Sequence, residues 1–222
     1  KGIDINKKNK DGNTALHYCA NKWKDEINEN NKTICKLLSS RPEININSIN
    51  NQGNTPLILA SKTGNINAVK LFLTTPIIDL NIKNKNNETA LYKAINNDNI
   101  TISKMLISSP NLNINLKILD DKLLLNFILK KMKKTSIDLS NLIELIIEKT
   151  EINLNDTNKK KETALYLSKK FNYINISNLL IENGAEDNIG ISIEPIKNPT
   201  GNPTGEPRLK GDKGDKGDTF NF

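Results

Sequence analysis

The sequence predicts an all-α solenoid of five helix-turn-helix repeats with short β-hairpin arms, followed by an extended C-terminal tail. The first observation behind this prediction is a four-residue motif of alternating apolar and polar residues that recurs five times. It begins at residues 3, 44, 78, 112 and 152, so the steps are 41, 34, 34 and 40 residues. The second observation is that two longer blocks follow every copy in the same order. A period of this length is typical of a repeat array, in which each unit contacts only its neighbours.

The first element of each unit is a short extended arm. The motif reads IDIN, ININ, IDLN, LNIN and INLN in the five copies, and its alternation suits an extended segment. A second block follows, reading DGNTALHYCA, QGNTPLILAS, NNETALYKAI, DDKLLLNFIL and KKETALYLSK. We expect its threonine to cap a short helix, as at Thr55, where Pro56 would occupy the first helical turn.

The second helix of each unit follows a Gly- or Asn-rich break such as residues 63–65. Apolar residues recur at helical spacing in its five copies, TICKLL, AVKLFL, ISKMLI, LIELII and ISNLLI. Pro42, Pro76 and Pro110 come after three of these helices, which they are expected to end, because the residue before a proline avoids the helical region. The predicted domain covers residues 1–190, with repeats near 3–43, 44–77, 78–111, 112–151 and 152–188.

This pattern resembles the ankyrin repeat. DGNTALHYCA is similar to the family signature D-x-x-G-x-T-P-L-H-x-A, and IENGAEDN at residues 181–188 is similar to its closing G-A-D. Copy four lacks the Gly, Thr and His of the signature, so we expect an irregular turn there. Copies one to three have Pro where the family usually has Gly-Ala. Copies one and four are longer, and alignment with the family pattern places the additions between the two helices, around residues 23–29 and 130–135.

No motif of a catalytic, cofactor or metal site occurs in the sequence. It lacks G-x-S-x-G, a phosphate-binding glycine loop, C-x-x-C and H-E-x-x-H. We therefore predict a protein that is not an enzyme and that binds no cofactor and no metal. His17, the only histidine, falls where ankyrin repeats carry a hydrogen-bonding His, and we interpret it as structural. Cys19 and Cys35 make no disulfide framework, and we interpret them as buried core thiols, with a redox function as the alternative.

The two additions lead to two further interpretations. Trp23 is either an exposed anchor for a partner or a cover for the open face of the first repeat. The KKMKK run at residues 130–134 is interpreted as a solvated loop rather than a site for an anionic partner.

Charge and hydropathy narrow the class of partner. The formal net charge is +7, which favours acidic partners. Nucleic acid is disfavoured, because the chain has only two arginines and no stacking aromatics beside its lysines. No apolar run is long enough to span a bilayer and no signal peptide is visible. Because the chain begins without Met and enters a motif at once, we expect it to be a fragment.

Ankyrin proteins bind partners through their hairpin tips and the exposed face of their first helices, and the resemblance implies that role for fifteen positions here. Most of them are lysines, so the expected partner is a protein with an acidic surface. The alternative is that a coding bias toward Lys, Asn and Ile filled these positions. The positions are Lys8, Lys10, Asn13, Lys22, Ile49, Asn51, Gln52, Lys62, Lys83, Lys85, Glu88, Lys117, Lys122, Lys159 and Lys160.

The tail changes composition after residue 190. Residues 191–210 form an expected Pro/Gly linker, and residues 211–222 begin a G-x-y segment, GDKGDKGDT, of the kind that a collagen triple helix requires. Together with an Ile/Asn/Lys-rich array, these triplets resemble the collagen-like proteins of amoeba-infecting giant viruses of the Mimivirus type. The resemblance implies a place in the virion surface fibre, self-trimerisation through a longer tail, and modification of Lys213 and Lys216.

Three functions follow from these observations. The main prediction is a non-enzymatic protein-protein interaction module on a viral collagen-like stalk. The alternative is an adaptor in the host cell cytoplasm that recruits a host factor and has a disordered tail. A basic nucleic-acid-binding protein is the third and the least favoured.

Overall fold

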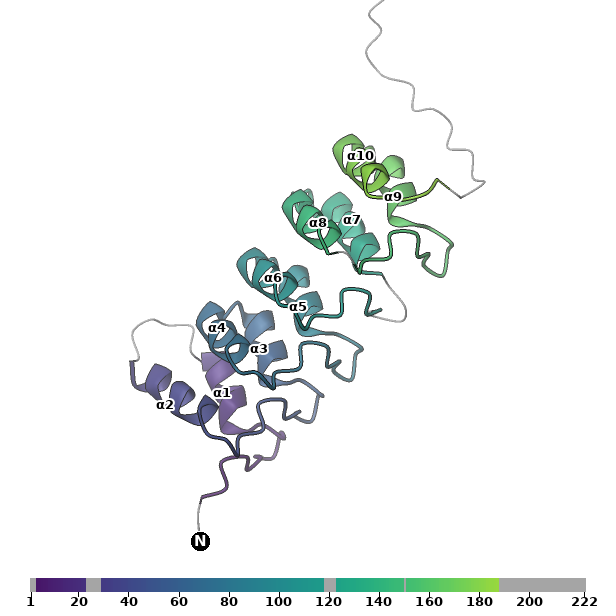
Figure 1. The fold of residues 1–222 in the computed structure, drawn as a ribbon. Helices are drawn as coiled ribbons and strands as arrows, with labels where there is room; N and C mark the ends of the chain where they lie inside the picture. The colour runs from purple at the N-terminus through teal and green to yellow at the C-terminus, as the bar shows by residue number, and fades with distance from the viewer. Residues whose placement is uncertain (1–2, 23–28, 118–122, 150, 188–222) are drawn as a thin grey trace, which may run out of the picture. The chain divides into compact units, whose positions relative to one another are not determined.

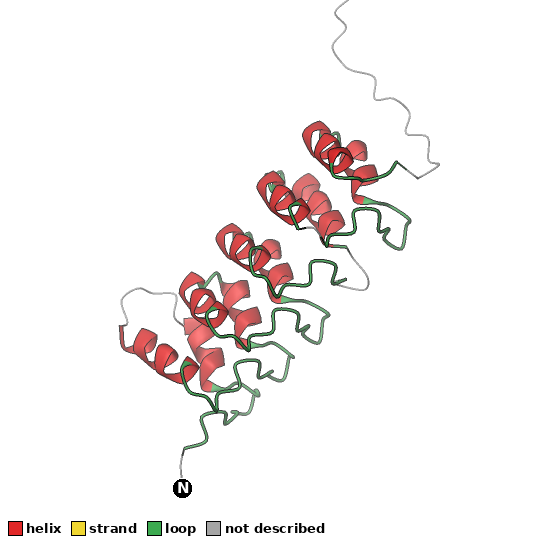
Figure 2. Ribbon diagram, in the orientation of Figure 1, coloured by secondary structure: helices red, strands yellow, loops and turns green. Residues whose placement is uncertain are grey.

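The computed structural model describes residues 3–22, 29–117, 123–149 and 151–187, all within the first of two units into which the chain divides at Gly190. In these residues it contains ten α-helices and no β-strand (Figures 1 and 2). The helices form five pairs, and the first helix of each pair packs against the first helix of the next. Their bounds are α1 Ala15–Lys22, α2 Glu29–Ser39, α3 Pro56–Thr63, α4 Ile66–Leu73, α5 Ala90–Asn96, α6 Ile100–Ile107, α7 Leu124–Thr135, α8 Ser140–Ile147, α9 Ala164–Lys170 and α10 Ile174–Glu182.

Threonine side chains start three of the first helices, as the sequence predicts. The hydroxyl oxygens of Thr55, Thr89 and Thr163 each accept the backbone N–H three residues on, which satisfies one of the free donors of the first turn. Pro56 occupies the first position of α3. In copy four Leu123 precedes α7 and makes no side-chain cap, so this helix depends on its packing.

One hydrophobic core runs through all five pairs. It contains residues of the arms, such as Ile46, and residues of both helices, such as Leu57, Phe72 and Ile128, all at most 1% exposed. Each such side chain contributes roughly 1.5–3 kcal/mol by leaving water. A single pair could bury only one face of its apolar residues, so the stack supplies the core.

A ladder of asparagines joins the arms of successive repeats. The fourth residue of every arm motif is Asn, and its amide bonds to the backbone at the start of the next arm or, for Asn155, to the closing segment of copy five. Asn81 Nδ2 donates to the Asn111 carbonyl at 3.0 Å, and Asn81 Oδ1 accepts the Asn113 N–H at 2.8 Å. The same two bonds recur at every member of the ladder: Asn6, Asn47, Asn81, Asn115 and Asn155.

A second set of asparagines closes the tip of each described arm. Asn9, Asn50, Asn84 and Asn158 each accept two backbone N–H groups of their own turn on the side-chain oxygen. Each tip also has a residue with positive φ, which is Gly53 at 77° in copy two and Lys161 at 58° in copy five. The arms of the described residues are therefore tight turns braced by side chains, and not the β-hairpins that the sequence predicts. Their hydrogen bonds join nearby residues of one turn and do not pair two strands.

The addition in copy four is helical, which corrects the interpretation of KKMKK as a solvated loop. Residues 130–134 form the last turns of the twelve-residue helix α7. Met132 is buried, Lys130 Nζ lies 2.8 Å from Glu162 Oε2 in copy five, and Lys131 Nζ lies 2.9 Å from Asp98 Oδ1 in copy three. The extra turns thus connect copy four to both of its neighbours. The addition in copy one, with Trp23, lies outside the described residues.

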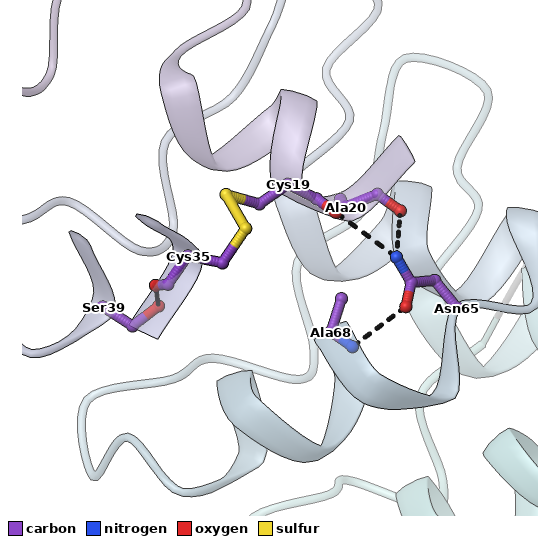
Figure 3. Close-up of a disulfide and its surroundings, with 6 residues drawn as sticks. All are labelled: Cys19, Ala20, Cys35, Ser39, Asn65 and Ala68. Atoms are coloured by element: carbon purple, nitrogen blue, oxygen red, sulfur yellow. Dashed lines mark hydrogen bonds between the residues drawn. A yellow bond between two sulfur atoms is a disulfide. The ribbon is translucent and has the colours of Figure 1, made fainter. Parts of the chain in front are cut away.

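The two cysteines are bonded to each other, which corrects the interpretation of Cys19 and Cys35 as buried thiols. A disulfide joins Cys19 of α1 to Cys35 of α2, with the Cα atoms 5.7 Å apart (Figure 3). Both residues are buried, as expected for core positions. The sequence prediction was wrong because two cysteines 16 residues apart carry no sign of pairing until the helices are packed together.

Candidate partner-binding surface

The predicted partner-binding positions lie on the arm tips and on the first helices. In Figure 2 the green arms of successive repeats lie side by side along one edge of the helix stack. Backbone bonds join the tips directly, from Asn51 N to the Asp11 carbonyl at 2.9 Å and from Lys85 N to the Gln52 carbonyl at 3.1 Å. The backbone that presents these side chains is therefore fixed by bonds within and between repeats.

Most of the fifteen predicted positions are exposed on this surface. Asn13 is half-buried and Glu88 is buried, Lys22 is the last residue of α1, and Lys122 lies outside the described residues, as do Lys213 and Lys216. The exposed positions, which we call the arm surface, are Lys8, Lys10, Ile49, Asn51, Gln52, Lys62, Lys83, Lys85, Lys117, Lys159 and Lys160.

Glu88 is directed to the interior of the array rather than to a partner. Its Oε2 lies 2.6 Å from Lys93 Nζ and accepts Asn84 Nδ2 at 2.8 Å. Burial alone would raise the pKa of Glu88, but the bonds from Lys93 and Asn84 outweigh it, so the pKa is lowered. Glu88 thus stays ionised and braces the tip of the third arm.

Glu162 has the same role in the fifth arm, and sequence reasoning did not single it out. Its Oε2 accepts Asn158 Nδ2 at 2.9 Å and lies 2.8 Å from Lys130 Nζ. Burial again opposes ionisation, while Lys130 and Asn158 favour it and lower the pKa of Glu162. A signal was available in the sequence, because Glu88 and Glu162 both stand directly before the capping threonine of their repeats.

His17 joins the first repeat to the second. Its Nδ1 accepts the Thr14 N–H at 3.1 Å, so the proton must lie on Nε2, which donates to the Asn54 carbonyl at 2.9 Å. Burial lowers the pKa of His17, the bond to Asn54 partly opposes this, and the charge of Lys8 lowers it further. In copy four Asn126 takes the same place and donates to the Glu162 carbonyl at 2.8 Å.

The described part of the chain lacks two features, a cluster of metal-ligating side chains and a membrane-spanning helix. No group of three or more His, Cys, Asp or Glu side chains there could hold a metal ion. The helices found there are all too short or too polar to cross a membrane. A cavity lined by Ile114, Leu124 and Ile152 among others encloses only about 20 Å³, roughly the room for one water. A more open one of about 400 Å³ is lined by residues of copies four and five, among them Met132, Ser136 and Tyr173.

The model of the family described as ankyrin repeats (3 copies) matches residues 1–73 and 26–118, more than half of the chain. The chain is an ankyrin-repeat protein. Its described residues form five pairs of helices, stacked as in an ankyrin array. Ankyrin folds typically serve as binding scaffolds rather than as enzymes.

Solved structures with the same fold cover most of the array. An ankyrin repeat domain from Acinetobacter baumannii is 20% identical with a TM-score of 0.68, covering 84% of this chain and 89% of that chain. The ankyrin repeat domain of Bcl-3, of the IkappaB family, is 16% identical with a TM-score of 0.64, covering 83% and 76%. Both show the fold alone.

A third similar structure is a complex. It contains the predatory endopeptidase Bd0816 of Bdellovibrio bacteriovorus and the immunity protein Bd3460, and the similar chain is 25% identical with a TM-score of 0.58, covering 81% of this chain and 84% of that chain. No curated protein matches the sequence.

Proposed function

We propose that the ankyrin array binds a protein partner with an acidic surface through the arm surface. The observation that carries this proposal is the row of exposed lysines on the braced tips of the first, third and fifth arms, among them Lys10, Lys83, Lys85 and Lys160. The backbone that carries these lysines is held in place before binding, so less backbone entropy is lost on association. The similar chain in the complex of Bd0816 and Bd3460 supports a role in protein binding.

The composition of the arm surface also bears on the kind of partner. The second arm is uncharged at its tip, where Ile49, Asn51 and Gln52 are exposed. An apolar and amide-rich patch between two lysine-bearing tips fits a folded protein with an apolar spot inside an acidic surface better than it fits a uniform polyanion.

A matched pair of triple variants tests the proposal. K83Q/K85Q/K160Q removes three charges from the arm surface, and K36Q/K70Q/K104Q removes three exposed charges from the second helices α2, α4 and α6. With poly-L-glutamate as the acidic probe, we expect the first variant to bind about tenfold more weakly and with a shallower salt dependence. Equal losses in both variants, or binding that does not change with salt, would contradict the proposal. A single-stranded oligonucleotide bound as well as the probe would favour the nucleic-acid alternative.

A finer version of the proposal concerns the tail. We propose that the array is displayed on a collagen-like stalk of a viral surface fibre, supported by the strict glycine period of GDKGDKGDT. Peptide mass spectrometry of the natural protein should then find hydroxylated Lys213 and Lys216, and sedimentation of the natural protein should find a trimer. Unmodified lysines in a monomer would favour the adaptor in the host cytoplasm.

A further inference from the structure

The Cys19–Cys35 bond joins two helix positions that recur in all five repeats. Aligned on the repeat, the two positions are both buried in every copy. In copy five they are serines whose hydroxyls hydrogen bond at 2.8 Å. The full set of pairs is Cys19 and Cys35, Ala60 and Val69, Ala94 and Ser103, Ile128 and Ile143, and Ser168 and Ser177. Burial of both positions therefore belongs to the fold, and copy one is the repeat in which the pair is bonded covalently.

The first repeat lies at one end of the described stack, so its second helix lacks a neighbour that the inner second helices have. α2 packs on α1 and α4, whereas α4 has α2 on one side and α6 on the other. Residues 23–28, between α1 and α2, lie outside the described residues.

The exposure of equivalent side chains shows that α2 lies at the end of the stack. Ile34 on α2 is 51% exposed, whereas Ala68, the equivalent residue of α4, is 0% exposed. Ile102, also equivalent, is 1% exposed. Among the described helices, α2 has no preceding second helix beside it, whereas α4 packs on α2 and α6 packs on α4.

The other partner in the bond is fixed to the rest of the array. Asn65, which caps α4, donates from Nδ2 to the carbonyls of Cys19 at 3.3 Å and Ala20 at 3.0 Å, while its Oδ1 accepts the Ala68 N–H (Figure 3). The end of α1 is thus anchored to the second repeat. The disulfide links this anchored end to Cys35 on the end helix α2.

We propose that the Cys19–Cys35 disulfide is a redox-controlled latch on the first repeat. In the oxidised protein it holds α2 against α1 and α4. In the reduced protein α2 separates from the array in a fraction of molecules and uncovers the face of α4 on which it packs. The rest of the array keeps its fold in both states, because no other covalent link is involved and each repeat contacts only its neighbours.

The reductant belongs to the class of dithiols. A thiolate of the dithiol attacks the Sγ of one cysteine, the sulfur-sulfur bond breaks, and a mixed disulfide forms. The second thiol of the dithiol then displaces the protein sulfur. The dithiol loses two electrons and becomes a cyclic disulfide, and Cys19 and Cys35 become two thiols after taking up two protons. Because Cys19 is 7% and Cys35 2% exposed, the attack takes place when the first repeat opens.

Hydrogen exchange on the full chain, with and without dithiothreitol, tests the latch. We expect the amides of α2 to exchange roughly a hundredfold faster after reduction, the factor that chain-entropy estimates give for a loop of this length. The amides of α5 and α6 should not change. Equal exchange of α2 in the two states would overturn the proposal, as would alkylation of both cysteines by iodoacetamide in the non-reduced protein.

Copy two supplies the matched control. The variant Cys19→Ala with Cys35→Val copies the pair Ala60 and Val69, so it should fold with a packed contact and no bond. Its α2 amides should exchange at one rate with or without dithiothreitol. If its α2 responded to the dithiol as the natural protein does, the reagent would act elsewhere and the latch would be refuted.

Discussion

Replacing His17 by alanine removes the hydrogen bonds that connect the first two repeats through an imidazole. The Thr14 N–H loses its acceptor, and the Asn54 carbonyl loses one donor but keeps the N–H of Asn50. With about 1 kcal/mol for each lost bond and a small cavity, we expect the free energy of unfolding to fall by roughly 2–3 kcal/mol. His17→Asn should recover about 1 kcal/mol, because Asn126 makes the equivalent bond in copy four.

The same variants have a signature in the pH dependence. The folded-state pKa of His17 is lowered, so its contribution to stability is complete above the unfolded pKa of about 6.5 and is lost as the pH falls through the folded pKa. Because His17 is the only histidine, no other side chain has its ordinary pKa in this window. We expect the natural protein to lose up to about 1.4 kcal/mol per pH unit below pH 6.5, and both variants to lose this slope.

Urea unfolding followed by circular dichroism at pH 7.5, 6.5 and 5.5 measures both effects. Two results would refute the reasoning: a His17→Ala variant as stable as the natural protein at pH 7.5, or one that keeps the natural slope between pH 6.5 and 5.5. In either case the imidazole would not be a buried neutral link between repeats.

Three further substitutions test the arms by urea unfolding. Gly53→Ala places a Cβ 2.8 Å from Lys85 N at a φ of 77°, so we expect a loss of about 2 kcal/mol or more; an unchanged midpoint would contradict the close approach of the two tips. Lys161→Gly relieves a φ of 58° and should add about 1 kcal/mol, and a loss of stability would argue against strain there. Asn81→Ala removes the two bonds of Asn81 in the asparagine ladder and should cost about 1–2 kcal/mol, more than the same change at an exposed residue outside the ladder.

The helices and their starts could be predicted from the sequence because they depend on local chemistry. A threonine such as Thr89 caps a helix by accepting the backbone N–H three residues on. The apolar residues at helical spacing in the second helix of each repeat indicate one shared core. The family was also predictable, since the repeated blocks carry most of its signature.

The helical addition in copy four was not predictable from its charge. A run of lysines indicates a solvated segment, but Lys and Met are good helix formers, and the run continues a helix that has already begun. Its lysines pair with acceptors in other repeats, Asp98 and Glu162, which are 32 residues or more from them in the chain. The arms likewise resemble strands in their alternation, yet side-chain bonds from residues such as Asn84 close them as turns.

The sequence by itself determined the period, the helix pairs and the residues of the core, because these follow from spacing and from interactions within one repeat. Only the tertiary structure decided the environment of individual polar groups. It placed Cys19 beside Cys35, turned Glu88 inward to Lys93, and set His17 against the second repeat. The bond between Cys19 and Cys35 joins the two helices of one pair, and the bond of His17 crosses a repeat boundary. A pattern repeated along the chain describes what the repeats share, whereas such contacts depend on where they differ.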